Sequence, residues 1–359
     1  MSGAGPDVQI SRSNFDDDLL RNWWTDSYNS GILARNTFFQ SWEWNSTWHD
    51  HFVRDDRRRE LVLLRVEKQG RIVAAVPLFL QQRNAGPIRA WRYLLWIADR
   101  LSQYPDLVTT ERDAVALWPA IQAFMHREYP DAWMTLHDVL PESTAASFFA
   151  EGGERSPGEP YLRVVLAEGN EAIRLGNCSP HMQREILRAR RLLEKEDRLE
   201  WRCHQSPDAT LIEQLIVLNR ARFGKASWFA DERNTAFFRA LSGVMDNELV
   251  ISEVSDGGTP IHLMASYLHG DTVHYVLSGM NEDAKRFSPG TMNLDCTLRW
   301  AMRQGYRYFD FLRGDEGYKR EFAPEERMSV HLTIPAVRGR TRWTLARAMQ
   351  KGRKAVDRM

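Results

Sequence analysis

The sequence is poor in cysteine and contains no long apolar run. Its 359 residues include three scattered cysteines, Cys178, Cys203 and Cys296, and no CxxC pair. This usage is typical of a reducing compartment and excludes a disulfide framework. No apolar stretch approaches the roughly 20 residues of a membrane span. The first ten residues lack the apolar core of a signal peptide. Together these absences predict a cytoplasmic protein.

Patterns that would bind a metal are also lacking. His49 and His51 lie two apart in a predicted helix, which places their side chains on different faces. Cys296 falls inside another predicted helix, where a buried core role is favoured over that of a nucleophile. We therefore expect no metal site.

The chain as a whole has no excess of one charge, although its C-terminal segment is strongly basic. Lysine plus arginine and aspartate plus glutamate both number 48. Residues 336–359 nevertheless carry eight basic side chains and one acidic one, so the remainder has a net charge of −7. The acidic body argues against general nucleic-acid binding. The basic tail is a candidate for peripheral contact with an anionic membrane or a synthase complex, or it is a solubilising terminus.

What the chain does contain is enough apolar sequence for two domains, since 43% of its residues are hydrophobic. A segment rich in glycine and proline, Pro141–Pro160, is interpreted as a linker. The predicted domains are residues 1–160 and 161–335, followed by a tail at 336–359. Both halves show strand, glycine turn, strand, further strand, helix and strand, which predicts duplication of one α/β unit. In the first half the predicted strands are 60–67, 71–81, 91–97 and 133–139, and the predicted helix is 113–129. In the second half the predicted helices are 180–193, 208–222 and 289–304, and the predicted strands are 249–254, 261–269, 272–279, 306–312 and 330–334.

The start of the helix at Pro289 is one place that could bind a ligand. Ser288 occupies the expected N-cap position, Pro289 the first helical position, and Gly290 and Thr291 the first turn. The first-turn amides of a helix lack intrahelical acceptors and carry the positive end of its dipole. With Arg286 beside them, they form a candidate phosphate site. An ordinary capped helix beside a solvated basic loop is the alternative.

The second such place is the run FDFLRGDEGYK, Phe309–Lys319, where a hydrophobic strand ends in charged residues. Ligands gather at the carboxyl ends of strands in open α/β sheets. Asp310 lies between two phenylalanines, so it is either buried and paired or on a different face from them. Arg313 is its candidate partner, and an Asp–Arg pair that only fixes the strand end is the structural alternative.

These segments carry a resemblance to a known family. The runs RFSPG (Arg286–Gly290) and FDFLRGDEGYKREF (Phe309–Phe322) resemble the CelD/BcsL-type GNAT acyltransferases linked to cellulose and exopolysaccharide production. FFQSWEWNSTW (Phe38–Trp48) and YPDL (Tyr104–Leu107) look like further marks of that family. The resemblance covers about Phe38–Ile334. It implies an α/β fold of two tandem GNAT-like domains, similar to the Fem transferases, each with a mixed, largely antiparallel sheet flanked by helices.

The resemblance also implies a reaction and its residues. Such enzymes dock the pyrophosphate of acetyl-CoA or another acyl-CoA on the helix start, here Arg286, Ser288, Gly290 and Thr291, and an amine or hydroxyl then attacks the thioester directly. Backbone amides polarise the carbonyl. An acid protonates the thiolate and a base takes the acceptor proton. By this resemblance Tyr318 is the acid, Asp310, Asp315 and His274 are candidates for the base, and Arg313, Lys319 and Tyr275 are candidates for substrate binding.

The helix start departs from the usual GNAT signature, because Arg286 lies four residues before Gly290 and Met292 and Asn293 replace the small residue. A Fem-like transferase that uses aminoacyl-tRNA is therefore an alternative. It is favoured by a basic helix face and opposed by the acidic body. A non-catalytic scaffold of an exopolysaccharide assembly is a further alternative. The residues of the basic face are Arg184, Arg188, Arg191 and Lys195.

Overall fold

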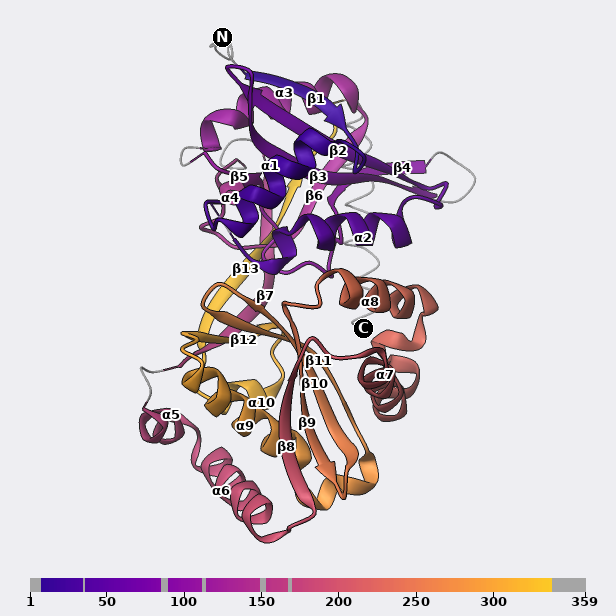
Figure 1. Ribbon diagram of the computed structural model, residues 1–359. Coiled ribbons are helices and arrows are strands. Elements are labelled where there is room, and N and C mark those ends of the chain that lie inside the picture. Colours follow the sequence, from indigo (N-terminus) through magenta and orange to yellow (C-terminus); the bar gives the residue numbers. More distant parts are fainter. Residues whose placement is uncertain are drawn as a thin grey trace, which may run out of the picture. The chain divides into compact units, whose positions relative to one another are not determined.

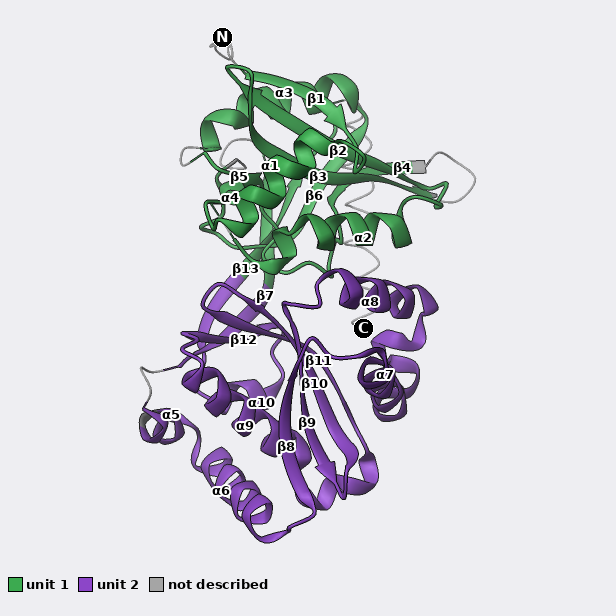
Figure 2. Cartoon of the chain, in the orientation of Figure 1, with its two compact units in different colours: residues 1–158, 329–359 green, residues 159–328 purple. Residues whose placement is uncertain are grey.

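The computed structural model of the protein describes residues 8–34, 36–84, 90–111, 114–148, 153–166 and 170–337. The chain forms two compact units (Figure 2). Unit 1 comprises Met1–Gly158 and Ser329–Met359, and unit 2 comprises Glu159–Met328. The last strand, which the sequence predicts as part of the C-terminal domain, thus contributes its residues from Ser329 onward to unit 1. Most of the basic tail lies outside the described residues.

Unit 1 is built on strands that pair in the order β1-β2-β3-β4-β6-β13 (Figure 1). All neighbours in this order are antiparallel except β4 and β6, which run parallel. The main elements of unit 1 are β1 (Val8–Ser13), α1 (Asp18–Asn29), α2 (Trp42–Phe52), β2 (Arg59–Lys68), β3 (Arg71–Asn84), β4 (Ala90–Trp96), β5 (Val108–Thr109), α3 (Trp118–Glu128), β6 (Ala132–Val139), α4 (Thr144–Phe148), the start of β7 (Glu154–Val165) and the end of β13 (Glu325–Ile334).

The two sequence motifs of unit 1 bind each other. Gln40 donates through Nε2 to the carbonyl of Tyr104 (2.8 Å), and the indole of Trp44 donates to the hydroxyl of Ser102 (2.7 Å). Asp106 is 5% exposed and accepts hydrogen bonds from the amides of residues 107, 144 and 145. A buried carboxylate is stable when amides satisfy it in this way. FFQSWEW and YPDL therefore contribute to the architecture of this unit.

Unit 2 repeats the arrangement with strands in the order β7-β12-β11-β10-β9-β8. Helices α6 and α9 lie on one side of this sheet and α7 and α8 on the other (Figure 1). The elements of unit 2 are α5 (Glu171–Asn177), α6 (Pro180–Lys195), β8 (Leu199–Gln205), α7 (Ala209–Phe223), α8 (Glu232–Val244), β9 (Leu249–Asp256), β10 (Thr259–His269), β11 (Thr272–Met280), α9 (Pro289–Arg303), β12 (Tyr308–Arg313) and α10 (Gly317–Arg320).

Each unit contains three consecutive antiparallel strands followed by a helix and a parallel strand. In unit 1 these are β2-β3-β4, α3 and β6, and in unit 2 they are β9-β10-β11, α9 and β12. The predicted fold class, a largely antiparallel α/β arrangement flanked by helices, is confirmed. The predicted linker, Pro141–Pro160, was wrong at both of its ends, because Thr144–Phe148 form helix α4 and the residues from Glu154 onward form strand β7. β7 contains Pro157, Gly158 and Pro160, which are unusual in a strand and misled the prediction.

Candidate functional site

The strands β11 and β12 diverge toward their carboxyl ends. They pair in parallel only where Thr272–His274 face Tyr308–Asp310. The register of β11 against β10 also shifts where Ala265 pairs with Leu277 and Ser266 with Tyr275, so that Val276 is the extra residue of a bulge. The diverging carboxyl ends of two parallel strands are where open α/β sheets bind ligands.

The first turn of α9 begins beside this divergence. Ser288 is the N-cap residue, as expected, but its backbone is left-handed (φ 50°) and its side chain makes no capping hydrogen bond. Its hydroxyl instead accepts from Nη1 of Arg188 (2.8 Å), and Nη2 of Arg188 donates to the carbonyl of Arg286 (2.8 Å). Arg188 of α6 therefore fixes the turn that precedes the helix, leaving the amides of Gly290 and Thr291 as the first-turn donors.

A buried polar group beneath this turn explains the departure from the usual signature. Asn293 is fully buried and donates to the carbonyl of Ser252 (2.9 Å), and its amide lies 2.9 Å from Nδ1 of His262. Its Oδ1 accepts from the indole of Trp201 (3.0 Å). A Cβ at Gly290 would lie 3.5 Å from Nε2 of His262. Asn293 therefore ties α9 to β8, β9 and β10, and Gly290 lies next to the imidazole of His262.

Tyr318 and Tyr275 meet across the divergence. The Tyr318 hydroxyl hydrogen-bonds to that of Tyr275, which donates to the hydroxyl of Ser278 (2.9 Å). Burial raises the pKa of both phenols. Tyr318 is nevertheless 38% exposed, so it can be reached from solvent. Both tyrosines are therefore neutral hydrogen-bond donors at physiological pH.

Helix α7 packs directly on the end of β11. A Cβ at Gly279 would come within 2.5 Å of the Asn219 amide nitrogen, so only glycine fits there. Asn219 donates through Nδ2 to the carbonyl of Ser278 (2.6 Å) and accepts from the hydroxyl of Ser227 (2.7 Å). This contact fixes Ser278, the residue of β11 whose hydroxyl accepts from Tyr275.

His274 and Asp310 face each other in the paired part of β11 and β12. They are 3% exposed, and Nδ1 of His274 is 3.7 Å from Oδ2 of Asp310. Oδ1 of Asp310 accepts from the amide of Leu312 (2.7 Å), whose left-handed φ of 62° makes a sharp turn at the strand end. Asp310 therefore stabilises the turn at the end of β12, in addition to lying near His274.

The charged residues after β12 pair mainly with their neighbours. Asp315 forms an exposed ion pair with Arg320, which holds the pKa of Asp315 below its usual value. Lys319 is 4% exposed, and its ammonium contacts Glu316 (2.7 Å) and the carbonyl of Arg313 (3.0 Å). Nε of Arg313 lies 3.5 Å from Glu159. The structure thus places Tyr318 and Tyr275 together, whereas Asp315 and Lys319 form contacts within this turn.

A carboxylate surrounded by arginines supports α9 from behind. Asp295 is 1% exposed and contacts Arg174 (2.6 Å), Arg190 (2.8 Å) and Arg299 (3.3 Å). Burial alone would raise its pKa, but the hydrogen bond from Arg190 and the charges of the three arginines outweigh that effect and lower it. The cluster links α5, α6 and α9 and so fixes the helix that carries the candidate anion site.

The sequence did not single out the residues that hold the site in place. Asn219, Ser278 and Arg222 lie in a helix and a strand whose existence was predicted, but nothing local distinguished their side chains. A usable signal was the pair Ser278-Gly279 at a strand end, because glycine there indicates a close backbone approach.

One comparison with known families decides the class of unit 2. Residues 180–320 match the family model described as Acetyltransferase (GNAT) domain. The chain carries a GNAT acyltransferase domain. All eleven predicted site residues lie between His274 and Lys319 and therefore inside the matched segment.

The GNAT domain and its companion unit are also similar in fold to solved structures. FemX aligns over 92% of this chain and 98% of its own with a TM-score of 0.61 and 9% identity. A conserved protein of unknown function from Bacteroides thetaiotaomicron VPI-5482 aligns over 91% and 99%, with a TM-score of 0.55 and 12% identity. L-PGS from Bacillus licheniformis aligns over 75% and 84%, with a TM-score of 0.50 and 13% identity. At these identities the likeness shows the fold alone.

Comparison with curated protein sequences gave no match. Within the described ranges, no group of three or more His, Cys, Asp or Glu side chains could hold a metal ion. In the same ranges, no helix is both long and apolar enough to cross a membrane.

Proposed function

We propose that the GNAT domain transfers an acyl group from acyl-CoA to an amino or hydroxyl group, with the donor phosphates on the first turn of α9. The observation that carries this proposal is the turn itself, where Arg188 holds Ser288 and the Arg286 carbonyl immediately before the helix. The amides of Gly290 and Thr291 lie in the first helical turn, where they have no intrahelical acceptor. Such a helix start fits a pyrophosphate. The departure from the usual signature is compatible with it, because Asn293 acts beneath the turn.

The acyl transfer follows from the groups nearby. The acceptor's lone pair attacks the thioester carbonyl, and the carbon–sulfur bond breaks as the tetrahedral intermediate collapses. Tyr318 donates its proton to the departing thiolate, and Tyr275 orients that hydroxyl through their hydrogen bond. The acceptor's own proton passes to a base, for which His274, Asp310 and Asp315 are the candidates. The bulge at Val276 supplies a backbone amide for the developing oxyanion. Positioning of donor and acceptor provides much of the rate.

A variant in the first turn tests donor binding. Thr291→Glu places a carboxylate in the first helical turn, where it stabilises the helix but repels a pyrophosphate. We expect acetyl-CoA or a longer acyl-CoA at 100 times its dissociation constant to stabilise the wild type by about 2.7 kcal/mol. Thermal melting should show that shift in wild type and Thr291→Val and lose it in Thr291→Glu. Equal shifts in all three proteins would show that donor phosphates bind elsewhere.

The acceptor is proposed to be a sugar or a polysaccharide precursor. This part rests on the resemblance of FDFLRGDEGYK to the CelD/BcsL-type proteins and on no feature of the fold. A panel of amino sugars and peptidyl amines, assayed for acyl transfer by release of free thiol, tests it. Transfer to peptidyl amines alone would exclude the sugar acceptor.

An aminoacyl-tRNA donor is the second candidate, favoured by the exposed basic face of α6. Arg184, Arg191 and Lys195 on that face are exposed, while Arg188 is engaged at the start of α9. Transfer from charged tRNA that depends on these side chains, with no melting response to any acyl-CoA, would support it. Complete rescue of a deletion strain by Tyr318→Phe would instead favour a non-catalytic scaffold.

A further inference from the structure

The last turn of α7 carries an exposed cation, Arg222, one turn beyond the contact of this helix with β11. Arg222 comes three residues after Asn219, which places both on neighbouring positions of one helical face. Asn219 is fixed to the carbonyl of Ser278, and the backbone of α7 touches Gly279. The position of Arg222 relative to the end of β11 is therefore set by the same contact that fixes the strand beneath Tyr275.

The charge of Arg222 reaches the groups that line the candidate site. It contributes to lowering the pKa of His262 below Gly290, and it opposes the rise that burial causes in the pKa of Tyr275 and of Tyr318. These three side chains extend from the start of α9 to the hydroxyl proposed as the acid. The geometry agrees with this, because Asn219, one turn before Arg222, binds the carbonyl of Ser278, whose hydroxyl accepts from Tyr275.

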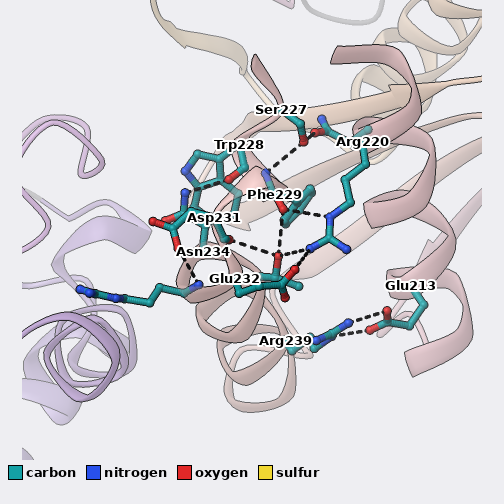
Figure 3. A network of polar contacts seen from close by, with 12 residues as sticks. Glu213, Arg220, Ser227, Trp228, Phe229, Asp231, Glu232, Asn234 and Arg239 are labelled. Atoms are coloured by element: carbon teal, nitrogen blue, oxygen red, sulfur yellow. Dashed lines mark hydrogen bonds and ion pairs between the residues drawn. The ribbon is translucent and has the colours of Figure 1, made fainter. Parts of the chain in front are cut away.

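Two nearby arginines, Arg220 and Arg239, form hydrogen bonds to carboxylates, whereas Arg222 forms none within the described part of the chain. Arg220 donates to the carbonyl of Phe229 (2.9 Å) and to Glu232 (2.6 Å), as Figure 3 shows. It also donates to the hydroxyl of Thr235 (3.0 Å). Arg239 makes two hydrogen bonds to Glu213 (Figure 3). Among the residues that the structure describes, no carboxylate pairs with Arg222, whose Cζ lies 4.9 Å from the ring centre of its neighbour Phe223.

The contacts of Arg220 also anchor the segment between α7 and α8. The carbonyl of Phe229 and the side chains of Glu232 and Thr235 bind the Arg220 guanidinium and so hold this segment in place. Ser227 in the same segment donates to Asn219. The backbone on both sides of Arg222 is therefore anchored, while its guanidinium keeps its hydrogen-bond donors for a ligand. A planar guanidinium binds carboxylate and phosphate oxygens in pairs.

We propose that Arg222 binds an anionic group, a carboxylate or a phosphate, of the substrate that reacts beside Tyr318. This inference rests on the proposed acyl transfer. The anion belongs either to the acceptor or to the donor's phosphates, and both would use the same guanidinium chemistry. Arg222 would then select among acceptors by charge or add to donor affinity.

Three variants separate this role from a structural one. Arg222→Gln removes the charge, Arg222→Lys keeps it without the planar fork, and Arg239→Gln is the control that removes another exposed arginine of the same helical layer. Glucosamine and glucosamine 6-phosphate serve as acceptors that differ by one phosphate. Coenzyme A and pantetheine serve as donor-side ligands with and without phosphates. Melting temperatures establish that each variant is folded.

If the anion is on the acceptor, wild type prefers glucosamine 6-phosphate through a lower KM. Arg222→Gln then raises that KM by roughly 10- to 100-fold, which is the usual effect of a hydrogen bond to a charged group, and leaves kcat and coenzyme A affinity unchanged. If the anion is on the donor, the same variant weakens coenzyme A by a similar factor and leaves pantetheine unchanged. In both cases Arg222→Lys shows a smaller loss and Arg239→Gln none.

Unchanged KM and unchanged coenzyme A affinity in Arg222→Gln, in an enzyme that transfers acyl groups, would overturn the inference. A wild-type protein that binds no acyl-CoA and transfers no acyl group would instead refute the proposed function. The two failures are therefore distinguishable in one set of measurements.

Discussion

Gly279 lies so close to Asn219 that a methyl group at position 279 would overlap the helix backbone, with 2.5 Å between the added Cβ and the Asn219 amide nitrogen. This contact joins α7 to the strand end that faces Tyr275. The position of α7, and with it that of Arg222, therefore depends on the absence of a side chain at residue 279.

Gly279→Ala should destabilise the protein by about 1–3 kcal/mol, because the added methyl group must push α7 from β11. Urea denaturation measures the change. Gly243→Ala in α8 is the matched control, since nothing lies within 4 Å of its added Cβ and alanine favours a helix. Equal stability of the two variants would contradict the close packing of α7 on β11.

Asp295→Asn should cost about 3–5 kcal/mol, because it leaves the buried Arg174 without its charge partner. The folded-state pKa of Asp295 is lowered, so its contribution is present above the unfolded value of about 4 and lost as pH falls through the folded value. The stability gap between wild type and variant should therefore narrow in acid. Glu213→Gln, which breaks an exposed pair, should change stability little at any pH.

His262→Gln should make stability less dependent on pH. Burial lowers the pKa of His262 to about 3, so the folded protein keeps the ring neutral while the unfolded chain takes up a proton near pH 6.5. Stability is therefore lost as pH falls below that value, by about 2 kcal/mol from this residue between pH 7 and pH 5. Denaturation at both pH values checks this. His181→Gln, at an exposed position, should keep the wild-type dependence.

Tyr318→Phe should reduce kcat by about 10²-fold and leave donor affinity and melting temperature unchanged, because it removes the proposed acid and keeps the ring. Burial raises the pKa of Tyr318, so the wild-type rate should show no loss of this acid until pH exceeds the ordinary tyrosine value near 10. Steady-state kinetics across pH measure both effects. A fully active Tyr318→Phe enzyme would remove Tyr318 from the mechanism.

Periodicity and turn residues predicted most of the second unit correctly, because long segments such as α6, α9 and β10 show strong local patterns. Local signals did not predict β8, which begins at Leu199, or the hydrogen bond from Asn219 to Ser278, which depends on two elements meeting in space. For the same reason, the sequence could not show that Lys319 is buried against Glu316 and the Arg313 carbonyl. The charged residues at the end of β12 were predicted to be catalytic or substrate-binding. Several of these side chains instead bind each other within the turn.

Unit 2 is inserted within the sequence of unit 1, since the chain leaves unit 1 after Gly158 and returns at Ser329. During synthesis, the ribosome must therefore complete the whole of unit 2 before the strand that pairs with β6 exists. Until then β6 presents an unpaired edge, which is prone to pairing with other chains. Rapid folding of unit 2 would shorten the time for which the edge of β6 is unpaired. The folding rate of the acyltransferase domain would therefore affect how much of unit 1 aggregates before it is complete.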